Sequence, residues 1–427
     1  MPSTYVYIYL EEGPVPAGLL ETIGVGREAT SRFAYGRRYL ERKDRLTIDP
    51  VQLPLHEANE GREYIAPEGF VLFNGIRDAS PDGWGRHLMD RAAGARSLSE
   101  FDYLIATGDA RVGALAFGPD LSGPKRIVPW EEDNLHGENL NLADMLEAVR
   151  ELDTAEGLAP EHRGFLVGGS SLGGARPKAT TEYDGKQWIA KFGRADDRFP
   201  VCRTEYVTMT LAGQVGIAVP PVRLEKILGQ DIYLIERFDR VPKGQNYRRL
   251  PFISGLTIIG AHESESPQQS YRRLGEQLRL FGSDPVKDAK ELWRRMVFNI
   301  LCNNNDDHLR NHGFLWDGKG WRLSPAYDIV PAPQVSLERD LAIGVGRKGR
   351  QATLRNALSD VASFGLSRKD AVQMARAMQQ TVKHSWVDLF RNNGFTPAEI
   401  ERLRTCFIAV DEPLENENDA TTSSLRR

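Results

Sequence analysis

The sequence contains few cysteines and no strong excess of one charge. Its 427 residues include three cysteines, at Cys202, Cys302 and Cys406, and no two of them form a C-x-x-C pair. That odd number and wide spacing argue against a disulfide framework and against a cysteine-ligated zinc site. The formal net charge of −4 predicts no general electrostatic attraction to nucleic acid, so direct DNA binding by this chain alone is disfavoured.

Long apolar runs are also missing from the sequence. No uncharged apolar stretch approaches the roughly 20 residues that a membrane-spanning helix needs, so no membrane association is expected. The first 13 residues lack a basic segment, and acidic residues interrupt their apolar run early. This pattern is typical of a strand and not of a signal peptide. A cytoplasmic location is therefore the expectation.

The composition along the chain predicts three folded segments and a tail. Residues 1–125 mix short β-like runs with Gly and Pro, and predict a β-rich N-terminal module. Residues 126–250 hold a Gly-rich segment followed by strand hairpins, and residues 251–410 turn helical. The tail, residues 411–427, is acidic and then rich in Thr and Ser, and is predicted to be disordered.

Local signals predict individual helices and strands. The dipeptide Asp184-Gly185 between two alternating runs is typical of a β-hairpin, and a second hairpin is expected to turn at Gly229-Gln230. Apolar residues at helical spacing predict a helix over 289–301 that ends in the Asn-rich stretch after it. The other expected elements are β-like runs at Tyr5–Leu10, Phe70–Phe73 and Val112–Phe117, and helices over 82–93, 141–152 and 203–215.

The segment from Asp306 to Asn311 carries the most informative chemical signal. An Asp followed five positions later by an Asn has the spacing of a protein-kinase catalytic loop. Phosphoryl transfer needs a carboxylate to orient the attacking hydroxyl and an oxygen ligand for Mg²⁺ nearby. A second metal-binding carboxylate is expected soon afterwards in the chain, and Asp328 follows a short hairpin that would return it to the same place.

Two other interpretations of this segment stay open at the level of sequence. The D-x-x-x-x-N spacing occurs often by chance, and Asp306 can be only a turn or cap residue. Alternatively, His308 and His312 have the i, i+4 spacing of a zinc site, with Asp306 as the third ligand. That spacing suits zinc only on a helix, and the Asn-rich flanks disfavour a helix here.

A Gly-rich segment, Val167–Lys178, precedes the first hairpin. Its glycines allow backbone N–H groups to approach nucleotide phosphates, although it does not end in the GK[ST] of a Walker A loop. Lys191 lies on the second strand of the hairpin, where a kinase needs a lysine for the phosphates, and Glu205 lies in the next helix, where it would orient that lysine. The alternatives are an edge-strand lysine with a solvated amine and a glutamate that stabilises a helix N-terminus.

The order of these features predicts a fold class. A glycine loop, a strand lysine, a helix glutamate, a D-x-x-x-x-N loop and a metal aspartate follow one another as in a protein kinase. We therefore expect an α+β, protein-kinase-like bilobal fold with a β-rich N-terminal part and an all-helical C-terminal lobe.

Four segments together resemble the HipA family of bacterial serine/threonine kinases, which act as toxins of type II toxin–antitoxin modules. They are Ser171–Lys178, Glu236–Arg240, Asn305–Asn311 and Ser324–Asp328, and they occur in the family's order. The resemblance extends over about residues 5–410.

The resemblance implies roles for individual residues. Asp306 would be the catalytic aspartate, Asn311 and Asp328 would hold Mg²⁺, and Ser171 would be the autophosphorylation site, with Ser170 as the neighbouring alternative. The residues expected to contact ATP are Gly173, Gly174, Ala175, Arg176, Pro177, Lys178, Lys191, Glu236, Phe238, His308, Asn311, Tyr327 and Asp328.

Within that set, the resemblance implies that Lys191 contacts the phosphates. Glu236 and Phe238 would lie at the hinge against the adenine, and Gly173–Lys178 would close over the phosphates. A phosphate of about −1.5 to −2 charge on Ser171 would expel a loop that must itself embrace phosphates.

The resemblance also implies partners. A small helix-turn-helix antitoxin of the HipB kind would neutralise the toxin, and operator DNA would be bound only through it. The protein substrate would be an aminoacyl-tRNA synthetase such as the glutamyl enzyme, and its phosphorylation would cause growth arrest and persistence.

The chain departs from the family pattern at a few positions. Asp307 stands where the best-known member has glycine, and Arg176-Pro177 stiffens the glycine loop. The usual kinase D-F-G is replaced by Tyr327-Asp328-Ile329, as is the family's habit. Two other functions remain open, namely a small-molecule kinase on the same fold and a catalytically silent component of a repressor complex.

Overall fold

The computed structural model of the chain describes residues 2–24, 26–56, 61–128, 141–152, 162, 174–244, 246–334, 336 and 338–414. The chain forms two compact units, and each is assembled from discontinuous segments. Unit 1 comprises Met1–Cys202, Pro221–His262 and Phe314–Gly318, and unit 2 comprises Arg203–Pro220, Glu263–Gly313 and Lys319–Arg427.

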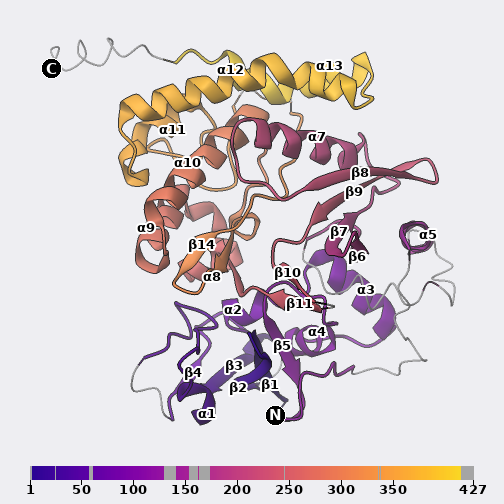
Figure 1. Cartoon of the computed structure of the whole chain (residues 1–427), viewed down its shortest axis with the longest axis vertical. Helices are drawn as coiled ribbons and strands as arrows, with labels where there is room; N and C mark the ends of the chain where they lie inside the picture. The colour runs from indigo at the N-terminus through magenta and orange to yellow at the C-terminus, as the bar shows by residue number, and fades with distance from the viewer. Residues whose placement is uncertain are drawn as a thin grey trace. The chain divides into compact units, whose positions relative to one another are not determined.

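The first part of unit 1 is an antiparallel sheet with the strand order β4-β3-β2-β1-β5 (Figure 1). Its strands are β1 Ser3–Leu10, β2 Gly13–Ile23, β3 Thr30–Tyr35, β4 Glu63–Ile65 and β5 Leu115–Gly118. Alternate residues such as Val6, Ile8 and Phe33 are fully buried in one core, so the strand predicted at Tyr5–Leu10 is confirmed. Short helices complete this part, at η1 Gly26–Glu28, α1 Arg37–Leu40, α2 Asn74–Arg77, α3 Gly83–Ala93 and α4 Glu100–Ala106.

The β-like run predicted at Phe70–Phe73 is wrong. These residues form an irregular segment that leads into α2, and Leu72 and Phe73 are buried in the core of the first sheet. An apolar run of four residues signals burial, but its periodicity does not distinguish a strand from another buried segment.

The second sheet of unit 1 is also antiparallel, with the order β6-β7-β9-β8. Its strands are β6 Lys178–Tyr183, β7 Lys186–Lys191, β8 Val222–Ile227 and β9 Gln230–Glu236. Asp184 and Gly185, with φ of 52° and 66°, make the predicted turn. The second turn lies one residue earlier than predicted, at Leu228 (φ 47°) and Gly229 (φ 81°), because Gln230 already pairs with Ile227 in the ladder.

The two faces of this second sheet differ in character. Apolar side chains of one face, including Ala179, Ala190 and Leu234, share a buried core with α3 and with α5 Leu142–Leu152. Both helices were predicted from the sequence. Because side chains alternate along a strand, Lys178 and Lys191 point to the opposite face.

A buried ion cluster follows the end of β9. The Asp239 carboxylate accepts hydrogen bonds from Arg237 Nε (3.0 Å) and Nη2 (2.8 Å), from Arg240 Nη1 (2.8 Å) and from the backbone N–H of Gly113 (2.8 Å). Burial alone would raise the pKa of Asp239, but the two guanidinium groups lower it more, so that the pKa lies well below its usual range. The carboxylate is therefore ionised at every physiological pH.

The two arginines of this cluster join β9 to the N-terminal module. Arg237 donates to the carbonyls of Ala110 (2.7 Å) and Arg111 (3.1 Å), and Arg240 donates to those of Arg111 (2.6 Å) and Gly113 (3.0 Å). The segment Glu236–Arg240, which is predicted to contain hinge residues, thus also holds two parts of unit 1 together.

Unit 1 is completed by short elements. They are β10 Arg240–Lys243, β11 Asn246–Arg249, β12 Phe252–Ser254, α8 Gly255–Ile259 and most of β13 Gly313–Trp316.

Unit 2 is mainly helical. It contains most of α7 Val201–Gln214, then η3 Glu263–Gln268, α9 Tyr271–Phe281, α10 Pro285–Cys302, η4 Leu309–Asn311, β14 Trp321–Leu323, α11 Leu354–Ala357, η5 Leu358–Phe364, α12 Arg368–Asn392, α13 Pro397–Leu403 and η6 Arg404–Asp411. The helices predicted over 203–215 and 289–301 correspond to α7 and α10. Within the described part of the chain, no helix combines the length and the apolar character needed to cross a membrane.

Replacing Asp239 by Asn tests the ion cluster. The change leaves two buried guanidinium groups without their counter-charge, so we expect the free energy of unfolding to fall by about 3–5 kcal/mol in urea titrations. The matched control is Asp196→Asn, which removes a 78% exposed carboxylate 3.3 Å from Arg194 and is expected to cost less than about 1 kcal/mol. Equal losses in the two variants would contradict the role given to Asp239.

Candidate functional site

The candidate site begins where α10 ends. Asn303 adopts the left-handed conformation (φ 51°) that terminates the helix, as the sequence predicts. Its side-chain Nδ2 donates to the carbonyl of Ala332 (2.5 Å), and its own carbonyl accepts from the N–H of Ala332 (3.0 Å). The chain therefore leaves α10 in a fixed direction, and residues 304–308 form an irregular segment that leads into η4.

The predicted catalytic loop is closed on itself. Asn311 Nδ2 donates to the carbonyl of Asp306 (2.6 Å), and the N–H of Asn311 donates to the carbonyl of His308 (2.9 Å). The first and last residues of the D-x-x-x-x-N segment are therefore in direct contact. This bond fixes the orientation of the Asn311 amide, and its Oδ1 is the atom that can coordinate a metal ion.

Asp306 presents its carboxylate to solvent. The side chain is 80% exposed, and His308 Nε2 lies 3.8 Å from Asp306 Oδ1. Partial desolvation and the nearby Asp328 carboxylate raise the pKa of Asp306, whereas His308 lowers it. The Asp328 carboxylate thus acts electrostatically on Asp306.

Asp328 reaches this position through the short hairpin and an unusual backbone conformation. The N–H of Ser324 donates to the carbonyl of Gly313 (2.9 Å), which brings the chain back beside the loop. The Tyr327 hydroxyl donates to the carbonyl of Arg310 (2.7 Å). Asp328 itself has a φ of 56°, and such left-handed non-glycine residues often occur at functional sites.

The carboxyl of Asp307 is buried beneath the loop and holds it. Tyr271 donates its hydroxyl proton to Asp307 Oδ2, and the N–H of Ala342 donates to Oδ1 (2.7 Å). Burial raises the pKa of Asp307 to about 7, although its hydrogen bonds partly oppose that effect. Two neighbouring aspartates therefore differ sharply, since Asp306 faces water and Asp307 anchors the loop.

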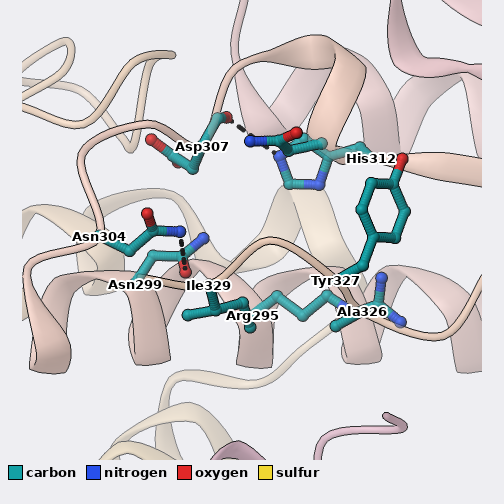
Figure 2. Close-up of a pocket in the computed structure, with 9 residues that line it drawn as sticks. Arg295, Asn299, Asn304, Asp307, His312, Ala326, Tyr327 and Ile329 are labelled. Atoms are coloured by element: carbon teal, nitrogen blue, oxygen red, sulfur yellow. Dashed lines mark hydrogen bonds between the residues drawn. The ribbon is translucent and has the colours of Figure 1, made fainter. Parts of the chain in front are cut away.

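Polar side chains from α10 continue this network (Figure 2). Asn299 Nδ2 donates to the Tyr271 hydroxyl (2.8 Å), and Asn304 Nδ2 donates to Asn299 Oδ1 (3.1 Å). Figure 2 shows Asn299 projecting from α10 toward Asn304, whereas Arg295 extends toward Tyr327 and donates to the carbonyl of Ser324 (2.6 Å). The cavity that these residues line has a volume of about 10 Å³, so the interior of the loop is almost completely filled.

The structure does not favour the zinc interpretation. His308 and His312 flank η4 and do not lie on an α-helix, and His312 Nε2 lies 3.2 Å from the carbonyl of Asp307. Burial, and to a smaller extent Arg295, lower the pKa of His312 to about 3, so its ring is neutral. Among the residues that the structure describes, no group of three or more His, Cys, Asp or Glu side chains could hold a metal ion.

In unit 1, the two predicted phosphate-binding lysines lie side by side. Lys178 and Lys191 are paired directly across β6 and β7, and they are only 5% and 7% exposed. Lys191 Nζ lies 5.6 Å from the centre of the Tyr233 ring. Gly174 has a φ of 96°, which favours glycine, and a Cβ atom added there would displace Lys178 Nζ. This arrangement suits an anion at the glycine segment.

Backbone hydrogen bonds hold the described end of the Gly-rich segment to two neighbouring elements. The Gly174 carbonyl accepts from the N–H of Trp84 (2.8 Å), and the Pro177 carbonyl accepts from the N–H of Phe192 (2.9 Å). Arg176 Nη1 contacts the Asp197 carboxylate at 2.8 and 3.0 Å. Ala175 lies against Gly83 of α3. The predicted stiffening at Arg176-Pro177 thus includes an ion pair between Arg176 and Asp197.

The two predicted hinge residues, Glu236 and Phe238, already have partners within unit 1. The Glu236 carboxylate pairs with Lys186 Nζ (2.8 Å), and the N–H of Glu236 donates to the carbonyl of Pro221 (2.9 Å). Only its carbonyl is therefore left for a backbone contact with a base. The Phe238 ring lies beside that of Phe252, with centres 6.3 Å apart.

The roles expected for several other residues stay predictions. Ser170, Ser171 and Gly173 lie outside the described residues. Glu205 is buried in α7 within unit 2, whereas Lys191 belongs to unit 1, so their pairing stays a prediction.

Sequence reasoning missed the residues that support the loop. Tyr271, Asn299 and Asp307 come from separate segments of the chain. The sequence singles out only Asp307 among them, as a departure from the family pattern. Buried polar residues on the apolar face of a predicted helix, such as Asn299, are the signal that would identify them.

Comparisons with known proteins show what the chain is similar to. Residues 170–386 match the family model described as HipA-like C-terminal domain, and residues 7–118 match that described as HipA N-terminal domain. "Putative kinase Y4dM" of Sinorhizobium fredii is 25% identical over 392 residues, which cover 87% of this chain and 89% of the relative. The serine/threonine-protein kinase toxin HipA of Shewanella oneidensis is 25% identical over 200 residues, covering 41% of this chain and 46% of the relative.

A solved structure shows the same fold. The HipA chain in the Shewanella oneidensis complex of HipA, HipB and operator DNA superposes with a TM-score of 0.66, covering 95% of each chain at 17% identity. At that identity the likeness shows the fold alone. It confirms the predicted mixed α+β class.

The raised pKa of Asp307 predicts an unusual pH dependence of stability. An Asp titrates near 3.9 when unfolded, and Asp307 titrates at about 7 when folded. The folded state therefore binds more protons between these values, and stability falls as pH rises through them. We expect the free energy of unfolding of the wild type to decrease relative to Asp307→Asn by up to about 1.4 kcal/mol per pH unit.

Urea unfolding at several pH values between 4.5 and 7.5 measures this difference. The exposed Asp388→Asn is the matched control and should keep the wild-type profile. Parallel profiles for the wild type and Asp307→Asn would contradict the buried titration.

Proposed function

The chain belongs to the HipA family, and from that premise we propose that it is an ATP-dependent serine/threonine-protein kinase of the toxin type. The family membership and the kinase relatives support phosphoryl transfer in general. The choice of serine or threonine, the protein substrate and the toxin activity belong to the proposal.

One observation carries the proposal, namely the contact between the two ends of the D-x-x-x-x-N loop beside Asp328. Asn311 is bonded to Asp306, and Asp328 is close enough to raise the pKa of Asp306. These contacts support a single site made of the two carboxylates and the Asn311 amide oxygen. A hard divalent cation would relieve the repulsion between the carboxylates, and this donor set suits Mg²⁺.

In this proposal Asn311 Oδ1 and Asp328 hold Mg²⁺, and Asp306 acts on the substrate. Magnesium would neutralise charge on the nucleotide phosphates. Asp306 accepts a hydrogen bond from the attacking hydroxyl, orients it and receives its proton. Its 80% exposure leaves the carboxylate accessible to a hydroxyl presented by another protein.

Unit 1 supplies the proposed nucleotide contacts. Lys178 and Lys191 offer two positive charges on one face of the second sheet, and Gly174 leaves room for Lys178 Nζ. Both lysines fit the negative charge of ATP phosphates. The Glu236 carbonyl and Phe238 are the proposed contacts of the adenine.

The partners are proposed from the relatives. The Shewanella oneidensis structure contains HipA, HipB and operator DNA. By likeness, we expect this chain to bind a small helix-turn-helix antitoxin, and to reach DNA only through it. An aminoacyl-tRNA synthetase in the cytoplasm is the proposed substrate class.

Substitutions in the loop test the catalytic assignment. With purified chain, Mg²⁺ and radiolabelled ATP, we expect Asp306→Asn to lower the rate of phosphate incorporation into protein by about 10²- to 10⁴-fold. Asp328→Asn should raise the Mg²⁺ concentration needed for activity while leaving stability unchanged, because Asn tolerates a positive φ. Asp388→Asn, at an exposed site on α12, is the control.

The possible results of that assay separate the alternatives. Undiminished activity in Asp306→Asn would contradict the proposal. Phosphorylation of metabolites but of no protein would indicate a small-molecule kinase. Absence of nucleotide binding by the wild type would indicate a silent component of a repressor complex.

The Gly-rich segment is the proposed site of autophosphorylation. We expect Ser171→Ala to abolish phosphate incorporation into the chain itself but not into a protein substrate, as measured by mass spectrometry of tryptic peptides. Ser170→Ala is the matched control and should keep the modification. A phosphate on Ser170 in the wild type would move the assignment by one residue.

A further inference from the structure

Unit 2 contains a second, larger pocket away from the catalytic loop. It has a volume of about 350 Å³ and lies between the segment 339–353, the start of α11 and η6. None of its lining residues belongs to the Asp306–Asn311 loop or to the cavity beneath it. A volume of this size is typical of sites for small ligands.

Three positively charged side chains line this pocket, namely Arg339, Lys348 and Arg355. The single acidic residue of the lining is Glu412, and both of its oxygens are already used. They accept hydrogen bonds from the backbone N–H groups of Leu354 and Arg355, each at 2.9 Å. Within the described ranges of the chain, none of the three cations forms an ion pair with a carboxylate. The pocket thus has an excess of positive charge.

Arg339 is buried in the wall of the pocket. It is 8% exposed, and its Nη2 donates to the carbonyl of Thr405. Its Nε and Nη1 find no acceptor among the residues that the structure describes. Buried N–H groups without partners cost free energy, more so on a charged group. An anion that reached the guanidinium would recover that cost.

The backbone around the pocket is firmly held. The buried Asn356 side chain accepts the N–H of Lys348 (2.9 Å), and it donates to the carbonyls of Gly349 (3.0 Å) and Gln351 (2.9 Å). The N–H of Ala352 donates to the carbonyl of Arg339 (2.8 Å). The backbone that carries the cations is therefore preorganised, which lowers the cost of binding.

We propose that Arg339, Lys348 and Arg355 form a binding site for a phosphomonoester, separate from the kinase site. A phosphomonoester carries about −1.5 to −2 charge at pH 7 and three acceptor oxygens, which matches several cations better than a carboxylate does. The remaining volume holds the organic part of the ligand. This inference does not depend on the chain being an active kinase.

Arginine side-chain NMR of the full-length chain tests the site, with inorganic phosphate as the probe. The Arg339 N–Hε signal, assigned by its loss in Arg339→Lys, should shift and saturate below about 10 mM phosphate, at ionic strength kept constant with sodium chloride. The double variant Lys348→Gln/Arg355→Gln should bind at least tenfold more weakly. Both of its substitutions are at exposed positions, so the fold should be retained.

The matched control is the double variant Arg347→Gln/Lys369→Gln, which removes two exposed charges that do not line the pocket. It should keep the wild-type affinity. No saturable shift of Arg339, or equal weakening in the two double variants, would overturn the proposal. Ribose 5-phosphate and a phosphoserine peptide, titrated separately, then show whether the phosphate belongs to a small molecule or to a protein.

Discussion

The buried carboxyl of Asp307 is the contact on which the candidate site depends. It joins Tyr271 of α9 to the N–H of Ala342 and lies directly after the residue with the proposed catalytic role. Through Tyr271 it is linked to Asn299 on α10. An irregular loop lacks the regular backbone hydrogen bonds of a helix or sheet. Buried side chains packed against it must therefore fix its conformation. Asp306 can remain exposed because its neighbour is held so firmly.

The same principle operates in unit 1 at Asp239. There a buried carboxylate between Arg237 and Arg240 ties the end of β9 to the N-terminal module. Buried charges of this kind contribute little net stability, but they are costly to disrupt, so they fix one arrangement of the chain. In both places a buried aspartate secures the backbone, while the residues proposed to act on ligands lie beside it.

Much of this organisation could be predicted from the sequence, because it is local. The Asp184-Gly185 turn, the helices at 82–93 and 289–301 and the end of the latter at Asn303 follow from turn chemistry and helical periodicity. The error at Gly229-Gln230 was one residue, since either side of Gly229 is compatible with a turn. The short run at Phe70–Phe73 was wrong because burial alone does not specify a strand.

The sequence by itself determined the family, through four segments that resemble it, and the α+β class, through the order of the elements. The spacing of Asp306, Asn311 and Asp328 along the chain also predicts the site residues. Only the tertiary structure decided which side chains support that loop and which cations gather away from it. Tyr271, Asp307 and Ala342 are far apart in sequence, as are Arg339 and Glu412. The roles of these residues depend on their burial and on their hydrogen-bond partners, and local spacing along the sequence specifies neither.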